Sequence, residues 1–134
     1  MSTEYLLPRK HTLLGSLVDP SIPVVVRTTA GDFTYRFLID TGAEFSVAPR
    51  RFASEVGLEW ASLPEIRVAG VEQGGITGRL GWLPLRLAGI DFSVRCIYMD
   101  VPTLSFLLGR ADFLDRFVVT IDAQQQKIIL TPIP

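Results

Sequence analysis

An apolar run that ends at a carboxylate places the strongest constraint on what this chain can fold into. The run Phe-Leu-Ile at positions 37–39 reads as a buried strand, and Asp40 follows it directly. A carboxylate that leaves a buried strand is costly unless hydrogen-bond donors reach it. Gly42 lets backbone amides approach the acid, and the Thr41 hydroxyl can donate from outside. Alone, the pattern fits either an acid held at the base of a cleft or an aspartate that caps a turn.

Size and charge bound the class of protein. At 134 residues the chain has the size of one domain, and its 48% hydrophobic residues argue against disorder. A formal net charge of −1 offers no attraction to nucleic acid or to an acidic membrane surface. No apolar run is long enough to span a bilayer, and the first residues lack the apolar core of a secretory signal. We therefore expect a soluble, cytoplasmic protein with no nucleic-acid partner and no membrane segment.

Cysteine and histidine are too scarce for several kinds of site. Cys96 is the only cysteine and His11 the only histidine. The chain therefore forms no internal disulfide, no cysteine metal cluster and no histidine-based triad. Cys96 lies in an apolar, strand-like run, which favours a buried structural thiol over a nucleophile. We expect neither a metal nor a cofactor.

Short apolar runs separated by turn residues predict a chain made mostly of strands. The expected strands are 21–29, 33–39, 66–70, 79–89, 90–100 and 103–109, with a closing hairpin at 118–130 that turns near Ala123 to Gln125.

One or two short helices are expected beside these strands. The first is 48–59, where Pro49 suits the first helical position and Gly57 the end, and the second is 110–117. Many short strands with few helices favour an all-β, mostly antiparallel barrel or sandwich. Residues 1–20 are expected to be an N-terminal arm, and 21–134 the domain.

Three features, in order along the chain, resemble one protease family. The stretch FLIDTGAEFSV resembles the active-site loop of aspartic proteases. The stretch PTLSFLLGRADFL at 102–114 is similar to the second motif of the retropepsins, the single-domain proteases of retroviruses and their bacterial relatives. Between them, GVEQGGITG lies where that family has its glycine-rich flap. The resemblance, closest to the bacterial branch, implies a closed barrel of the retropepsin type with a flap hairpin, and aspartic endopeptidase activity.

The chemistry of that family needs two acids. One ionised carboxyl takes a proton from water while a second, protonated carboxyl polarises the scissile carbonyl, so the pair shares a proton. The chain has one Asp-Thr-Gly, whereas Asp100, Asp112 and Asp122 are followed by Val, Phe and Ala. Asp122 reads as the turn residue of the last hairpin. The partner of Asp40 is therefore expected to be Asp40 of a second copy in a homodimer.

The resemblance carries further roles to single positions. Thr41 would link the two catalytic loops across the dimer, Gly42 would offer its carbonyl to the substrate, and Ala43 lies beside it. Glu44 stands where retroviral members usually have Asp. Arg110 would pair with Glu44 and brace the loop against the second helix, the alternative being two solvated surface charges.

Substrate contacts are expected from the loop, the flap and the cleft wall. The positions are Gly42, Glu44, Val71, Gly74, Gly75, Ile76, Pro102, Leu104 and Leu107. Pro102, Leu104 and Leu107 should line the cleft wall, and their apolar character predicts a peptide or protein substrate that is cut next to hydrophobic residues. For the flap, an ordinary glycine hairpin is the alternative.

Two other functions stay open at this point. One is a retropepsin-like module that dimerises or binds peptides with weak or no proteolysis, and the other is an unrelated small barrel with Asp40 in a turn. The C-terminal stretch KIILTPIP at 127–134 could supply a strand to a dimer interface, although Pro132 and Pro134 lack backbone donors.

Overall fold

The structure, a computed structural model, describes residues 1–68, 76–101 and 105–134, without the side chains of Val68 and Ile76. Most of this part is in strands. Their bounds are β1 Thr3–Leu6, β2 Arg9–Thr12, β3 Gly15–Val18, β4 Ser21–Thr28, β5 Gly31–Ile39, β6 Ser46–Pro49, β7 Glu65–Val68, β8 Ile76–Leu87, β9 Ile90–Met99, β10 Phe106–Leu108, β11 Phe117–Asp122 and β12 Lys127–Pro132.

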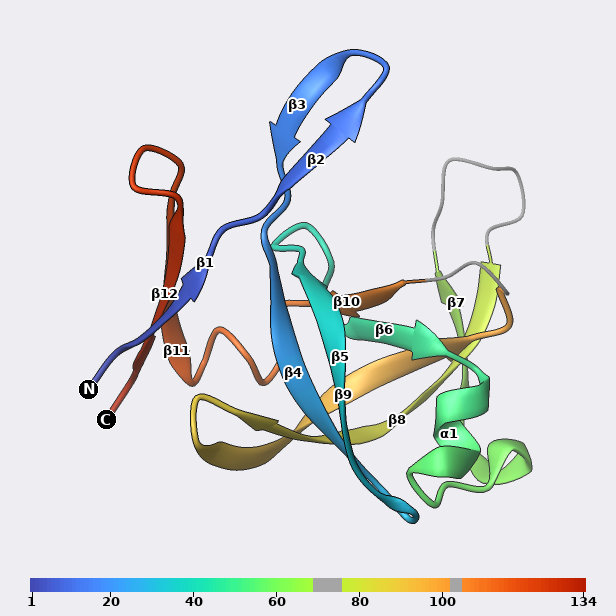
Figure 1. Cartoon of the computed structure of the whole chain (residues 1–134). Helices are drawn as coiled ribbons and strands as arrows, with labels where there is room; N and C mark the ends of the chain where they lie inside the picture. Colours follow the sequence, from blue (N-terminus) through green and yellow to red (C-terminus); the bar gives the residue numbers. More distant parts are fainter. Residues whose placement is uncertain (69–75, 102–104) are drawn as a thin grey trace.

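Six of the strands close into a barrel (Figure 1). The order of hydrogen-bonded neighbours is β4, β5, β10, β6, β9, β8, and β8 pairs with β4 to complete the circle. The closing pair aligns Val26 with Leu85. β7 extends the sheet beyond the barrel, where Ile66 pairs with Gly78 at the start of β8. Only β5–β10 and β6–β9 are parallel among the described pairs, so the expected closed, mostly antiparallel barrel is confirmed.

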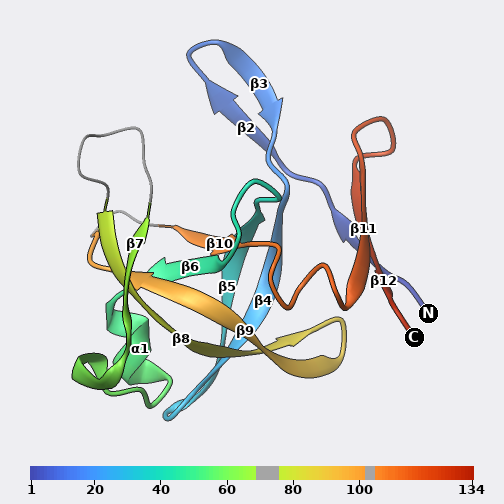
Figure 2. The same cartoon turned by 180° about the vertical axis from the view of Figure 1, so that it is seen from behind.

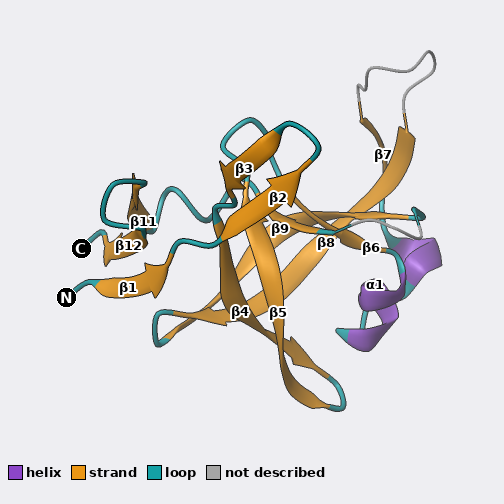
Figure 3. Ribbon diagram, turned by 45° about the horizontal axis from the view of Figure 1, so that its top comes forward, coloured by secondary structure: helices purple, strands orange, loops and turns teal. Residues whose placement is uncertain are grey.

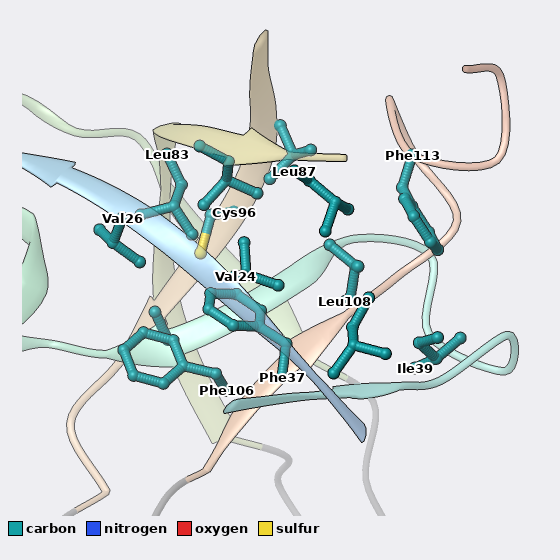
Figure 4. Packing of buried hydrophobic residues seen from close by; sticks show 14 of the residues in the cluster. Val24, Val26, Phe37, Ile39, Leu83, Leu87, Cys96, Phe106, Leu108 and Phe113 are labelled. Carbon is teal, nitrogen blue, oxygen red and sulfur yellow. The ribbon is translucent and has the colours of Figure 1, made fainter. Parts of the chain in front are cut away.

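Alternate residues of the strands fill the barrel (Figure 4). On β4, Ile22, Val24 and Val26 are buried, whereas the residues between them are more exposed. From β5, Phe37 stacks on Phe106 of β10 with ring centroids 4.6 Å apart. Each buried side chain of this size contributes about 1.5–3 kcal/mol to folding. The period-two pattern of the sequence therefore decides which face of each strand turns inward.

Cys96 lies inside this core, from β9 (Figure 4). Its side chain is fully buried, and that burial raises the pKa of the thiol well above its usual value. The thiol therefore stays protonated and inaccessible, and the predicted structural role of Cys96 is confirmed.

The two ends of the chain meet in a separate sheet beside the barrel (Figure 2). β12 lies between β1 and β11, and both pairings are within one chain. β1 covers one edge of β12 from Lys127 to Leu130, and β11 covers the other edge. Those residues therefore have no free edge for a strand from a second copy. Leu7, just after β1, is buried in the main core, whereas β2 and β3 form a hairpin on their own. The boundary at residue 20 stays a prediction.

The hairpin of β11 and β12 turns where the sequence predicts it. The Gln125 amide donates to the Asp122 carboxylate over 2.9 Å, which makes Asp122 the turn residue expected from the sequence.

The first predicted helix is much shorter than 48–59. Ala48 and Pro49 belong to β6, where they pair with Tyr98 and Met99 of β9, and α1 covers only Arg51–Glu55 (Figure 3). Gly57, at φ +85°, ends the segment as expected. A single-turn 3-10 segment, η1 (Trp60–Ser62), follows. In the described part, no helix has both the length and the apolar character needed to cross a membrane.

The second predicted helix, 110–117, is wrong: residues 110–116 form a bend and successive turns, and Phe117 begins β11. Asp112 has φ +67°, which a helix cannot contain. Its carboxylate accepts hydrogen bonds from the backbone nitrogen of Arg95, at 2.8 Å, and from Nε of the same residue, at 2.9 Å. Partial burial would raise the pKa of Asp112, but the hydrogen bonds from Arg95 outweigh it and lower that pKa. A contact with a distant strand overrides the local helical pattern.

Candidate active site

The loop that carries Asp40 is held open by a strand that passes between its two ends. β5 enters the loop and β6 leaves it, and β10 lies between them, parallel to β5 and antiparallel to β6. Leu108 aligns with Ile39, and Leu107 aligns with Val47. The Asp40 amide donates to the Leu108 carbonyl over 3.0 Å, which continues the ladder by one residue. The rigid barrel therefore fixes the point where the acid leaves the strand.

The Asp40 side chain is anchored at one of its two oxygens. The Gly42 amide donates to Oδ1 over 2.9 Å, and the Ala43 amide donates to the Asp40 carbonyl over 3.2 Å. A Cβ on Gly42 would lie 3.2 Å from Oδ1, so a larger residue would crowd the carboxylate. No hydrogen bond from the described residues reaches Oδ2. The carboxylate is thus oriented but keeps one oxygen available for another group.

The second motif braces this loop through its backbone. The Arg110 amide donates to the Ala43 carbonyl and the Ala111 amide to the Glu44 carbonyl, each over 2.9 Å. The buried Gly109 amide donates to the Ser46 hydroxyl over 3.1 Å. A Cβ on Gly109 would overlap the Phe45 carbonyl, so a glycine is required for the two segments to approach this closely.

The expected ion pair between Glu44 and Arg110 is wrong. It is absent from the ion pairs of the described residues, and both side chains are exposed. Main-chain hydrogen bonds already join the loop to the segment after β10, so the brace needs no salt bridge. Two solvated charges, the alternative given above, describe the pair.

A groove of about 430 Å³ opens beside Asp40. The residues that line it are Asp40, Gly42, Ala43, Glu44, Phe45, Val47, Ile66, Arg67 and Ile97. Val47, Ile97 and Met99 also form a small apolar cluster of their own, separate from the barrel core, against which Phe45 and Leu107 pack. The groove therefore combines apolar wall residues with the charged side chains of Asp40, Glu44 and Arg67.

The structure brings several of the predicted site residues together. Asp40, Gly42, Ala43 and Glu44 line the groove, and Thr41 is exposed in the same loop. Leu107 is half-buried behind the groove wall. Five other predicted positions fall outside the described residues: Val71, Gly74, Gly75, Pro102 and Leu104. Of Ile76 only the backbone is described, and it begins β8.

Sequence reasoning did not assign Phe45, Val47, Ile66, Arg67 or Ile97 to the site. A signal existed for the first two, because residues two apart in an extended chain share a face and both follow the acid closely. The other three come from β7 and β9. Their position depends on pairings such as Val47 with Ile97, which join segments 50 residues apart and leave no local pattern.

A second hollow, of about 390 Å³, lies away from Asp40 near the junction of the barrel and the terminal sheet. Ile90, Asp112, Asp115, Arg116, Pro132 and Ile133 line it. Asp112 is held by Arg95 there, which makes its carboxylate a structural group. Among the described residues, no cluster of histidine, cysteine or acidic side chains is suited to hold a metal ion.

Two solved structures share this fold. One is a retropepsin-like aspartic protease from Rickettsia conorii, with a TM-score of 0.66, 17% identity, and coverage of 97% of this chain and 91% of that chain. The other is the retroviral protease-like domain of Ddi1 from Leishmania major, with a TM-score of 0.51, 21% identity, and coverage of 87% of this chain and 94% of that chain. The expected retropepsin-type barrel is confirmed by these likenesses.

Sequence comparison identifies the family. DNA damage-inducible protein 1 of Yarrowia lipolytica is 28% identical over 94 residues, which is 67% of this chain but 23% of that protein. This chain thus spans only about a quarter of that relative's length. The family model described as aspartyl protease matches residues 22–113, a stretch that holds both the Asp40 loop and the segment that braces it. The chain therefore belongs to the aspartyl protease family.

Proposed function

We propose that two copies of this chain form one endopeptidase site, in which the two Asp40 carboxyl groups act as a pair. The observation that carries this proposal is the state of Asp40 itself: Oδ1 is bound by the Gly42 amide, and the described residues give Oδ2 no donor. Such a carboxylate is oriented for a reaction but lacks the second acid that peptide hydrolysis requires. The chain has one Asp-Thr-Gly, so a second copy is the source of that acid.

The reaction runs through a water molecule held between the two carboxyl groups. The ionised carboxylate takes a proton from the water, whose oxygen bonds to the carbonyl carbon, while the protonated carboxyl gives its proton to the carbonyl oxygen. The carboxyl that received the water's proton then gives it to the nitrogen as the C–N bond breaks, and a hydroxyl of the tetrahedral intermediate returns a proton to the other carboxylate. An acid and an amine leave, and the pair keeps its one proton. Because the pair needs one proton, the rate should fall on both sides of an optimum pH.

Glu44 is the one competitor for the second acid within the groove-lining set. It belongs to the same loop as Asp40, but no described hydrogen bond orients its carboxylate as the Gly42 amide orients Asp40. A pair made of Asp40 and Glu44 would let a single chain work alone. The experiment below therefore includes Glu44.

The groove supports a preference for hydrophobic residues next to the cleaved bond. Its wall includes Phe45, Val47 and Ile97, whose apolar surface gains from covering a nonpolar side chain. An extended peptide beside it can add backbone hydrogen bonds as a strand does. Residues 71–78 would act as the flap that excludes water over the substrate.

The test is cleavage of a peptide library by Asp40→Asn and Glu44→Gln, read by mass spectrometry at several pH values. Both changes remove one charge and keep the side-chain size. Asp40→Asn should lower the rate by at least about a thousandfold, and Glu44→Gln should change it by less than about tenfold. Cuts should cluster beside hydrophobic residues.

Other outcomes of this experiment reject the proposal in different ways. Wild-type cleavage that survives Asp40→Asn would show that Asp40 is not catalytic. An equal loss in Glu44→Gln would indicate a pair within one chain. Peptides that bind with equal affinity to wild type and Asp40→Asn, with no product from either, would identify a binding module.

A further inference from the structure

The hairpin of β2 and β3 (residues 9–18) stands apart from the rest of the described chain. Its two strands pair with each other from Arg9–Val18 to Thr12–Gly15 and form a sheet of their own. Figures 1 and 2 show it projecting from the barrel beside the turn that follows β5. A lone two-stranded hairpin is marginally stable in water, because it buries little apolar surface. Such an element gains most from a surface outside its own chain.

The tip of the hairpin carries two leucines where its turn has no need of them. Leu13 and Leu14 are 106% and 96% exposed. The turn is made by their neighbours: the Thr12 hydroxyl accepts from the Leu14 amide and donates to the Gly15 carbonyl, and Gly15 has φ +115°. Tight turns favour Gly, Asn, Asp and Ser, which hold the chain and stay solvated. Two leucines at this position instead offer apolar surface for contact.

Exposed apolar residues are concentrated on the N-terminal segment. Of the eleven large hydrophobic side chains that are exposed in the described part, six lie within the first 18 residues: Met1, Leu6, Leu13, Leu14, Leu17 and Val18. Four of these six, Leu13, Leu14, Leu17 and Val18, belong to the hairpin. Several exposed apolar side chains on one projecting element are a usual mark of a protein–protein contact.

The root of the hairpin is fixed next to the catalytic loop. The Ile39 amide, one residue before Asp40, donates to the Pro20 carbonyl over 2.8 Å. Ser21 aligns with Leu38, and the Arg36 guanidinium donates to the Ser21 carbonyl over 2.8 Å. The hairpin therefore leaves the barrel at the same point as Asp40, from a root that cannot swing freely.

We propose that this hairpin is a clasp that holds a second copy of the chain and so brings the two Asp40 residues together. The inference rests on the proposed function, because a pair made from two chains requires the second copy to approach at Asp40. Any copy that does so meets the hairpin, whose root is bonded to the residue before that acid. The leucines at the tip then leave water and pack on the second copy, and two-fold symmetry makes the contact twice. This role is separate from that of the termini, since β1 and β11 already cover the edges of β12.

The experiment compares Leu13→Ser/Leu14→Ser with wild type by sedimentation equilibrium of the full chain. Both residues are fully exposed, so the change leaves the folded monomer intact. The dissociation constant of the dimer should rise at least tenfold. Phe33→Ser is the matched control: Phe33 is an exposed residue of β5, six residues and about 20 Å along the strand from Ile39. It should leave the dissociation constant within about twofold of wild type.

A second variant keeps Leu13 and tests whether position 14 becomes covered when two chains associate. Because Cys96 is buried, a cysteine introduced as Leu14→Cys is the one accessible thiol of the chain. Its alkylation by a maleimide should slow several-fold as the protein concentration passes the dissociation constant. A rate that does not change with concentration would show that the tip remains exposed in the dimer.

The clasp and the proposed function fail in different ways. A double-serine variant that dimerises as tightly as wild type, or a wild type that stays monomeric at every concentration, overturns the clasp. If the double-serine variant dimerises more weakly than wild type, but wild type cuts no peptide, the clasp is supported and the protease proposal is rejected. If both hold, the double-serine variant loses cleavage at low concentration and recovers it at high concentration, whereas Asp40→Asn dimerises and never cleaves.

Discussion

The loop after β5 and the hairpin of β2 and β3 leave the barrel side by side, yet their own chain treats them in opposite ways. Residues 40–46 are tied down by main-chain hydrogen bonds to the segment after β10, and a buried hydroxyl and a required glycine bring the two together. Residues 9–18 pair with themselves and end in two fully exposed leucines. Contacts within the chain thus fix the shape of the loop, whereas the contacts of the hairpin tip are with a second copy of the chain.

This contrast separates two kinds of residue near one site. Changes in the braced loop should lower the free energy of unfolding of a single chain, because its contacts are internal. Changes at the hairpin tip should lower the affinity between chains and leave the single chain almost unaffected. Four variants test the contrast, taken from the largest expected effect on unfolding to the smallest.

Gly109→Ala should have the largest effect. Its Cβ would overlap the Phe45 carbonyl and lie 2.9 Å from the Ser46 nitrogen, and backbone atoms cannot move aside without breaking the brace. We expect a loss of about 3 kcal/mol in urea unfolding. Gly81→Ala is the control, because a Cβ there would meet only side chains, the closest being the terminal methyl group of Leu58 at 2.8 Å, which can move aside. Equal losses at the two positions would contradict the special closeness of loop and brace.

Ser46→Ala should come next. It removes the hydroxyl that accepts from the Gly109 amide, and leaves that buried amide without a partner. The expected loss is about 2 kcal/mol. In the matched change Ser54→Ala, an exposed hydroxyl that donates to the Arg51 carbonyl is lost, and the effect should stay below about 0.5 kcal/mol. Chemical denaturation of both variants shows whether the buried hydrogen bond between Gly109 and Ser46 contributes more to stability than the exposed one at Ser54.

Asp112→Asn should have a smaller, pH-dependent effect. Asparagine also tolerates the positive φ, so the change isolates the charge that holds the Arg95 amide. The half-exposed Arg95 guanidinium adds little, and we expect a loss of about 1 kcal/mol at pH 7. Because the pKa of Asp112 is lowered on folding, its contribution is present above the unfolded pKa and is lost as pH falls through the folded pKa.

Unfolding curves of wild type and Asp112→Asn should therefore converge in acid. A difference between them that stays constant from pH 7 down to about pH 2 would show that the ionised carboxylate is not the stabilising group.

The double change Leu13→Ser/Leu14→Ser should have the smallest effect on unfolding. At concentrations where the chain is monomeric, its free energy of unfolding should differ from wild type by less than about 0.5 kcal/mol, because exposed side chains contribute little to folding. Thermal unfolding of dilute protein measures this. A loss of unfolding free energy as large as that of Ser46→Ala would mean that the hairpin tip packs on its own chain. The loop and the hairpin would then not differ in the way described.

The sequence predicts the strands, the barrel and the Asp40 loop because these depend on local alternation and on a short motif. It fails at 110–117, where Asp112 takes a left-handed conformation to reach Arg95 on a strand 17 residues away. It assigns the brace to Glu44 and Arg110 because charges are visible in a sequence, whereas the backbone hydrogen bonds that make the brace are not. The groove residues of β7 and β9 could not be predicted either, because they reach Asp40 only through strand pairing, which the sequence does not show.

The pairing of β2 with β3 is not visible in the sequence. The residues RKHTLLGSLV lack clear alternation and carry leucines at the turn, so they read as an arm. Thr12 and Gly15 make the turn through a side-chain hydrogen bond and a positive φ, which are properties of a folded backbone. Local reasoning about turns explains where the chain reverses but not why its tip is apolar.

The central claim is that one catalytic pair is assembled from two copies of Asp40, and mixing chains tests it most directly. Wild type at a fixed concentration is titrated with Asp40→Asn, and peptide cleavage is followed after the subunits have exchanged. If two chains make one site, mixed dimers are inactive, so the rate falls to about half at equal amounts and to about a tenth at a ninefold excess. The control is a titration with Asp115→Asn, an exposed change outside the groove. This variant keeps Asp40, so the dimers that it forms are active and the rate should rise. A rate that does not respond to Asp40→Asn would show that each chain works alone and would contradict the account.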